Sequence, residues 1–215
     1  MGQIPVRLVY TLAEGPTLAA RLAVRLGRPV EAVPWGHPRP RDGLTVSALH
    51  PFDTFGRDRL EESGGTVLHW TRPSWRATAQ DRWLRVRDAR GAARALAALG
   101  VRRAFVTAGR DKSGVLLTAP PCEIRLRVRS VLPHPRHPAV VAVPGTGPFS
   151  VAEERLLLQR IGIDAVVAHD AGGTGAFPKL AAARQLRLPV ILLARPTEPR
   201  LLPFEVLVRR LAALM

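Results

Sequence analysis

Short apolar runs alternate along the chain with segments whose apolar residues recur every three or four positions. The runs Val6–Tyr10, Pro29–Trp35, Leu44–Leu49 and Thr66–Trp70 predict strands, whereas Pro16–Leu26 has the spacing of a helix. Strands that are separated by helices pair in parallel, with helices on both faces of the sheet. The first third of the chain therefore predicts an α/β fold.

The same alternation of strand-like and helix-like segments continues to the end of the chain. Further helices are predicted at Asp88–Gly100, Ser150–Gly162, Pro178–Leu186 and Phe204–Leu214, with strands at Arg103–Gly109, Ala139–Gly145, Ile163–His169 and Leu188–Ala194. Val115–Pro121 and Glu123–Val131 are expected to be strands or extended segments, the second with its arginines on a solvated face. This order predicts two α/β lobes with mostly parallel sheets, residues 1–105 and 106–215, with a cleft between them.

The helix at residues 150–162 has the clearest local signals. Ser150 lies three residues before Glu153, which is the spacing of a capping box. Leu156, Leu157 and Ile161 are predicted to form its buried stripe. The adjacent acidic pair, Glu153 and Glu154, is expected to be solvated or capping, as is the pair Glu61 and Glu62 in an earlier helix.

The chain is strongly basic, with 32 lysines and arginines and a net charge of +15. All but Lys112 and Lys179 of these are arginines. Such a charge favours anionic partners, which include nucleic acid, a polycarboxylate or the phosphates of a dinucleotide. Because the arginines are scattered and no zinc-finger, basic-heptad or RNA-binding signature is present, nucleic acid is the minority interpretation.

Other compositional features limit the remaining classes. Cys122 is the single cysteine, so an intrachain disulfide is excluded and it is interpreted as a small buried hydrophobe. A metal site is not expected. No apolar run is long enough to cross a bilayer, and the first residues lack the pattern of a signal peptide, which favours a cytoplasmic protein with no membrane partner.

A glycine-rich turn follows the predicted strand that ends at His169. Gly172, Gly173, Thr174 and Gly175 lead into a helix that carries Lys179. In open α/β sheets, ligands bind at the carboxyl ends of the strands, where backbone N–H groups at a helix start hold anions. The alternative is a tight turn that needs positive φ, with Lys179 merely solvated. Spacing alone leaves both interpretations open.

Several motifs together resemble the precorrin-6A reductases, which include the cobalt-precorrin-6A reductases. In the C-terminal lobe the matching positions are Gly147, Pro148, Phe149, Glu153, Glu154, Asp170, Gly172, Gly173, Lys179, Arg195 and Pro196. Upstream, the matching motifs are HPF at 50–52, RPSW at 72–75, RW at 82–83 and VTAGR at 106–110. The resemblance covers roughly residues 44–196.

The sequence departs from the family pattern at three places. Where the family has a Gly-Gly-Thr loop after its first strand, this chain has YTLAEG, Tyr10–Gly15, with one glycine. His169 and Ala171 replace a lysine and a serine beside the glycine turn, and a strand-loop unit between Pro38 and Leu44 looks trimmed. These departures keep open the alternative of a divergent homologue that binds a tetrapyrrole or nucleotide without reducing it.

The resemblance implies two Rossmann-like lobes and transfer of a hydride from NADPH or NADH to one double bond of the precorrin-6A or cobalt-precorrin-6A macrocycle, in cobalamin biosynthesis. The partner would be an anionic tetrapyrrole. The expected cofactor contacts are Thr11, Thr107, Gly109, Arg110, Gly172, Gly173 and Thr174. The expected substrate contacts are His50, Asp170 and Lys179, and no catalytic residue is assigned.

Each of these residues also has a structural interpretation. His50 follows a predicted strand and is either a cleft residue or a turn-packing histidine. Arg110 is either a clamp on a carboxylate or phosphate, or a surface arginine. Asp170 is expected to orient its loop through an Asx-type backbone bond rather than to act in catalysis. Phe52, Trp75 and Trp83 are expected to pack in the core.

Overall fold

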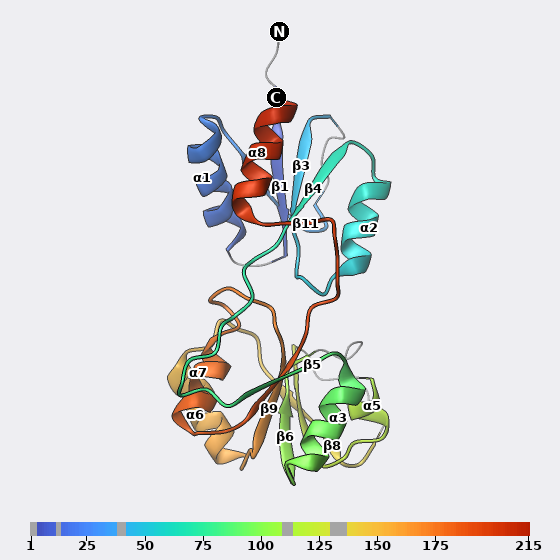
Figure 1. The fold of residues 1–215 in the computed structure, drawn as a ribbon, viewed down its shortest axis with the longest axis vertical. Helices are drawn as coiled ribbons and strands as arrows, with labels where there is room; N and C mark the ends of the chain where they lie inside the picture. The colour runs from blue at the N-terminus through green and yellow to red at the C-terminus, as the bar shows by residue number, and fades with distance from the viewer. Residues whose placement is uncertain (1–3, 12–13, 38–41, 109–113, 130–136) are drawn as a thin grey trace. The chain divides into compact units, whose positions relative to one another are not determined.

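The computed structural model describes residues 4–11, 14–37, 42–108, 114–129 and 137–215. The chain divides into two compact units (Figure 1): the first comprises Met1–Pro73 with Pro196–Met215, and the second comprises Ser74–Arg195. This division differs from the expected one at residue 105. The chain leaves the first unit after its fourth strand and returns to it for its last strand and last helix.

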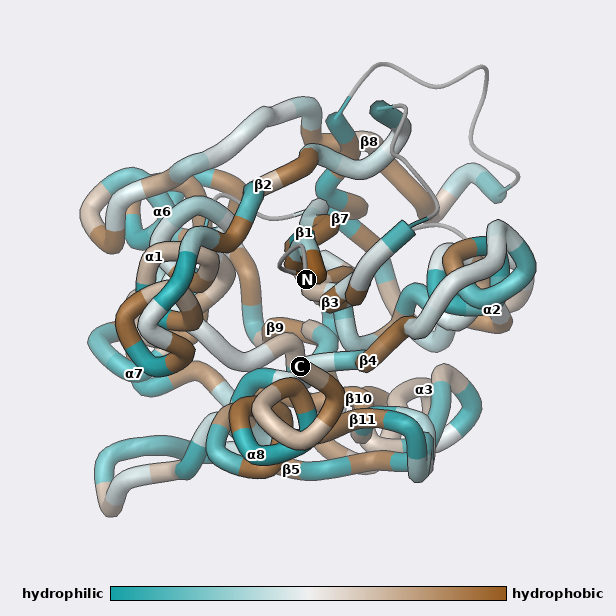
Figure 2. Tube along the Cα trace, turned by 90° about the horizontal axis from the view of Figure 1, so that it is seen from above, coloured by the Kyte–Doolittle hydropathy of each residue, from teal (hydrophilic) through white to brown (hydrophobic). Residues whose placement is uncertain are grey.

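The first unit contains a five-stranded parallel sheet. Its strands, in spatial order, are β11 (Leu201–Leu202), β4 (Thr66–Trp70), β3 (Leu44–Ala48), β1 (Val6–Tyr10) and β2 (Glu31–Pro34). Helices α1 (Gly15–Leu26) and α8 (Phe204–Leu214) pack on one face, over Leu8 and Val46, and α2 (Thr54–Glu62) packs on the other, over Val9 and Val33. In Figure 2 brown and teal alternate around α8, as expected for a helix that buries one apolar face.

The second unit contains a six-stranded parallel sheet. Its strands, in spatial order, are β5 (Trp83–Val86), β10 (Val190–Leu193), β9 (Ala165–His169), β6 (Arg103–Val106), β7 (Glu123–Val128) and β8 (Val140–Pro144). The helices are α3 (Ala89–Ala98), α5 (Val115–Thr118), α6 (Val151–Arg160) and α7 (Pro178–Gln185). Phe105, Val166 and Leu192 form one core with residues of α6 and α7. Parallel pairing throughout confirms the predicted fold class.

Two local predictions were wrong. Residues 115–118 form the short helix α5 rather than a strand. In α6 the fully buried positions are Glu154 and Leu158, whereas Leu156 is 59% exposed. The capping box of Ser150 and Glu153 is confirmed, with Ser150 N donating to a Glu153 carboxylate oxygen at 2.7 Å and Glu153 N donating to Ser150 Oγ at 3.2 Å. The helix therefore starts where expected but buries a different stripe.

The sequence predicted that the arginines of β7 lie on a solvated face, and this prediction was wrong. β7 is an interior strand between β6 and β8, and the side chains of Arg125 and Arg127 are only 20% and 12% exposed. The Arg127 guanidinium lies 4.1 Å from the ring centroid of Phe149 and donates from Nη2 to Glu154 Oε2 at 3.1 Å. A carboxylate and an aromatic ring thus replace water as its partners.

Candidate functional site

Each sheet changes its direction of strand addition once. In the first unit β2 lies on one side of β1 and β3 on the other; in the second unit β7 lies on one side of β6 and β9 on the other. The loops that follow these strands diverge at such a switch point, which is where open α/β sheets bind ligands. Thr11 follows β1 and His50 lies just beyond β3, whereas Thr107 follows β6 and Asp170 follows β9. The residues predicted from sequence therefore lie at both switch points.

The glycine-rich turn occupies the switch point of the second unit. Gly172 and Gly173 have φ values of 67° and 71°, in the left-handed region that favours glycine. The turn leads directly into α7, since the carbonyl of Thr174 accepts a hydrogen bond from Phe177 N at 3.1 Å. The positive φ is the feature that the tight-turn interpretation requires, and anion binding by the turn stays a prediction. Gly172 is buried and Gly173 is half-buried, whereas Thr174 and Gly175 are exposed, so the turn reaches the surface in its second half.

Asp170 is the residue that ties this turn to the rest of the second unit. It is 1% exposed, and its Oδ1 accepts a hydrogen bond from Trp75 N at 3.2 Å. Its Oδ2 accepts from Arg85 Nη1, and its carbonyl accepts from Arg195 Nε at 2.7 Å. These partners come from distant segments and not from an Asx-type bond within the turn. The carboxylate thus points into the protein, and its contacts support an orienting role.

Trp75 provides a second restraint on the turn. Its indole Nε1 donates to the carbonyl of Gly173 at 2.8 Å, and its ring lies 6.0 Å from that of Phe177. The side chain is 8% exposed, which confirms the expected packing role. The sequence did not indicate that the indole N–H also holds a turn residue, because Trp75 and Gly173 are 98 positions apart.

Lys179 lies in the first turn of α7 and is held by the protein. Its Nζ donates to the carbonyl of Ala176 at 2.7 Å, and burial lowers its pKa to about 8 against the attraction of Glu154. Glu154 is 2% exposed, and burial raises its pKa although Arg127 and Lys179 oppose that shift. A hollow of about 380 Å³ adjoins this cluster at the ends of β7 and β8, and Arg127, Phe149 and Glu154 are among its lining residues.

Thr107 and His50 lie at strand ends as predicted; Thr107 contacts the neighbouring strand, whereas His50 contacts its own turn. Thr107 N donates to the carbonyl of Val167 at 2.9 Å, which extends the pairing of β6 with β9. The carbonyl of His50 accepts from Asp53 N at 2.8 Å, and its Nδ1 accepts from Phe52 N at 3.3 Å. These contacts support the turn-packing interpretation of His50, and the buried Phe52 confirms its expected place in the core. Gly109 and Arg110 lie outside the described residues.

The switch point of the first unit is built differently. A Cβ at Gly15 would lie 2.1 Å from Cγ of Tyr10, so the single glycine of this loop gives space to a tyrosine ring. Glu14 is the N-cap residue of α1, and its Oε2 lies 3.2 Å from Nη2 of Arg72. The Arg72 side chain is only 6% exposed. Sequence reasoning matched Arg72 to a family motif but did not assign it to a site. Thr11, beside them, is exposed.

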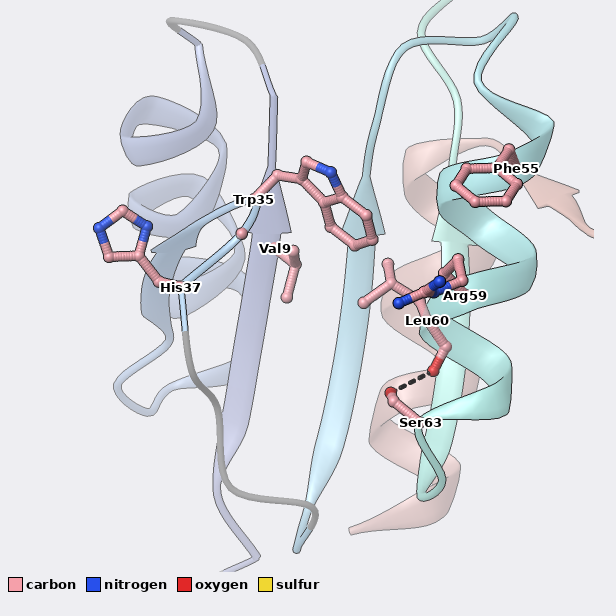
Figure 3. A pocket seen from close by; sticks show the side chains of 8 residues that line it. Val9, Trp35, His37, Phe55, Arg59, Leu60 and Ser63 are labelled. Atoms are coloured by element: carbon pink, nitrogen blue, oxygen red, sulfur yellow. Dashed lines mark hydrogen bonds between the residues drawn. The ribbon is translucent and has the colours of Figure 1, made fainter.

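A larger pocket of about 520 Å³ lies on the α2 side of the same unit (Figure 3). Its lining residues are Val9, Trp35, Gly36, His37, Phe55, Arg59, Leu60 and Ser63. Figure 3 shows Trp35 reaching over Val9 towards α2, whereas His37 points the other way. This is the face opposite α1 and α8, so the pocket is separate from the start of α1.

No group of three or more His, Cys, Asp or Glu side chains in the described part of the chain is arranged to hold a metal ion. None of the helices described has the length and apolar character needed to cross a membrane.

The parallel sheets and their switch points define a two-unit α/β protein of the Rossmann-like class. The chain belongs to the family of precorrin-6x reductases CbiJ/CobK, whose family model matches residues 46–212. This confirms the family resemblance inferred from the motifs.

Individual relatives agree with the family assignment. The chain is 35% identical over 159 residues to a precorrin-6A reductase of Sinorhizobium sp, and 36% identical over 169 residues to one of Rhodobacter capsulatus. These matches cover 71% and 74% of this chain but 60% and 66% of the relatives, so the chain spans less than two thirds of their length. A solved CobK precorrin-6A reductase superposes with a TM-score of 0.72 at 28% identity, covering 98% of this chain and 97% of that one.

Proposed function

We propose that this protein is a reductase that transfers a hydride from NADPH or NADH to a double bond of the precorrin-6A macrocycle, in cobalamin biosynthesis. The observation that carries the proposal is similarity to precorrin-6A reductases along nearly the whole chain, in sequence motifs and in fold. We further propose that the protein is cytoplasmic, as expected from its sequence. The cobalt-containing macrocycle is an equally suitable substrate for the same chemistry.

The residues of the second switch point fit a dinucleotide. The turn from Gly172 to Gly175 lies just before α7 and is exposed at Thr174 and Gly175, and the region before a helix N-terminus is a suitable environment for a phosphate or carboxamide oxygen. Thr107 and Thr174 lie at the same edge of the sheet and complete the predicted contacts. A bound reduced nicotinamide supplies the hydride, and the role of the chain is to orient the reactants and exclude water.

The predicted substrate contacts divide into two kinds in this proposal. Asp170 acts by holding the glycine turn, since both of its carboxylate oxygens have partners inside the second unit. Lys179 and His50 remain predicted contacts to an anionic tetrapyrrole. The net charge of +15 supports attraction of such a polycarboxylate.

Anaerobic turnover tests the proposal directly. The purified chain is mixed with NADPH or NADH and either precorrin-6A or its cobalt complex, and oxidation of the reduced nicotinamide is followed by absorbance. We expect loss of the reduced nicotinamide in proportion to macrocycle reduction. Tight macrocycle binding with no oxidation of either cofactor would instead identify a non-catalytic homologue. Binding to duplex DNA that weakens steeply with salt would favour the nucleic-acid alternative.

A further inference from the structure

An ion pair spans the switch point of the first unit. Arg72 follows β4, Glu14 directly precedes α1, and β3 lies between β4 and β1 in the sheet. The contact of Glu14 Oε2 with Arg72 Nη2 at 3.2 Å therefore crosses the carboxyl end of β3, beside the residues that follow β1. We propose that Arg72 binds the diphosphate of the cofactor, and that Glu14 occupies its guanidinium until the cofactor displaces it. This inference rests on the proposed function.

The burial of Arg72 requires an anionic partner. A guanidinium that is only 6% exposed has lost most of its hydration, and it cannot release its proton to become neutral. Glu14 provides the negative charge, and at 31% exposure its carboxylate is still in contact with water. Glu14 is therefore the member of the pair that can turn towards solvent, whereas Arg72 without an anion would be strongly unfavourable.

A diphosphate is a better partner for Arg72 than one carboxylate. It carries more charge and offers pairs of oxygens that match the planar guanidinium. The Trp70 ring, centred 5.9 Å from the Arg72 guanidinium carbon, adds a second restraint on that group. After the exchange Glu14 is solvated and Arg72 remains paired, so the protein keeps a buried charge satisfied in both states.

Gly15, the glycine of this loop, does not offer the alternative route to a phosphate. In a glycine-rich loop the absence of a Cβ lets the backbone approach the diphosphate closely. Here the bare Cα of Gly15 faces the Tyr10 ring, because a Cβ would be 2.1 Å from Tyr10 Cγ. A side-chain cation at the same switch point replaces that contact, and Arg72 is the buried arginine held there.

The test compares cofactor affinity in charge-removing variants. Titration of NADPH is expected to give about tenfold tighter binding for Glu14→Gln, because the competing anion is gone, and at least tenfold weaker binding for Arg72→Gln. In the double variant the gain from Glu14→Gln should disappear, since that gain acts through Arg72. Glu205→Gln is the matched control, because Glu205 pairs with Arg25 in the same unit at 2.6 Å, near the other end of α1.

Inorganic pyrophosphate, titrated against the same variants, separates this inference from the proposed function. If the wild type oxidises NADPH with precorrin-6A but Glu14→Gln binds NADPH and pyrophosphate no more tightly, the reductase assignment stands and the Arg72 assignment is wrong. If the wild type shows no turnover while pyrophosphate affinity follows Arg72 and Glu14 as stated, the anion site stands and the reductase assignment fails. Unfolding curves verify that each variant is folded. If Glu14→Gln loses stability without gaining affinity, the ion pair is purely structural and the proposal is wrong.

Discussion

The two switch points occupy equivalent places in two parallel sheets, yet the residues at them have different tasks. In the second unit two glycines with positive φ form the turn, and Asp170 and Trp75 hold it from inside. In the first unit the glycine is covered by Tyr10, and the charged group is Arg72 with its carboxylate partner Glu14. The comparison teaches that topology fixes where a ligand site lies, whereas local packing decides whether backbone or side chains are available to the ligand.

The largest effect is expected at the turn of the second unit. Gly173→Val places a β-branched residue at φ 71°, which costs about 1–3 kcal/mol of stability and adds bulk to a half-buried turn. We expect complete loss of reductase activity and of NADPH binding. Gly173→Asn should retain more of both, because asparagine tolerates the left-handed region better than valine does.

Gly100 offers the matched control in the same unit. It follows α3 with φ 63°, and a Cβ there would meet nothing within 4 Å. Gly100→Val should therefore lose similar stability in a urea titration while keeping NADPH affinity. A Gly173→Val variant with wild-type affinity would show that the turn is only structural, and the contrast between the two switch points would then disappear.

The next effect concerns the anchor of that turn. Asp170→Asn removes a buried charge on which Trp75 N and Arg85 Nη1 converge, and we expect a loss of about 2–4 kcal/mol in the free energy of unfolding. We expect a loss in the lower half of this range, because the Arg85 side chain is 43% exposed and water can hydrate it when the ion pair is lost. Equilibrium unfolding in urea measures the loss.

Asp164→Asn is the control for this prediction. Asp164 Oδ2 accepts hydrogen bonds from the backbone N atoms of Arg102 and Arg103 in the same unit, but its side chain is 34% exposed. We expect a change below about 1 kcal/mol there. Equal losses for the two variants would mean that Asp170 is an ordinary carboxylate and does not anchor the turn.

The central strands and the glycine turn could be predicted from the sequence because their signals are local. Strands such as β1 and β9 are buried on both faces and therefore appear as continuous apolar runs. The edge strand β5 has exposed residues at Leu84 and Arg85, and β11 has two residues, so neither carries a comparable signal. The boundaries of the units depend on those two strands, through the pairing of β5 with β10 and of β11 with β4.

The contacts that position the site were not predictable in the same way. Asp170 meets Arg85 across 85 positions and Trp75 across 95, and no periodicity records such pairs. The buried face of α6 was mispredicted because Glu154 occupies a core position that an apolar residue would normally mark. Its burial depends on Arg127, a strand residue 27 positions away, as its partner. Buried ion pairs of this kind are invisible to hydrophobic patterns.

The first switch point is tested through its glycine. Gly15→Ala inserts a methyl group against the Tyr10 ring and is expected to lose about 1–3 kcal/mol of stability. In a Tyr10→Ala background the same substitution should be almost neutral, because the clash is with that side chain. A double-mutant cycle in urea measures the coupling, and an equal loss in both backgrounds would show that the backbone, not the ring, requires glycine. No side-chain deletion should rescue Gly173→Val in this manner.

The smallest effect is a pH dependence that distinguishes the cations at the two switch points. Lys179 has a pKa of about 8 in the folded protein and about 10.5 when unfolded, because burial disfavours its charged form. Between these values the unfolded chain binds more protons, so stability should rise as pH increases from 8 to 10.5, by at most about 1.4 kcal/mol per pH unit. Lys179→Met removes this titration, so the unfolding free energy of the wild type minus that of the variant should increase across that range. Parallel curves would mean that Lys179 is hydrated.

Arg72 stays charged throughout this pH range. The second switch point can therefore relieve its buried cation by losing a proton, whereas the first can do so only by retaining an anion such as Glu14.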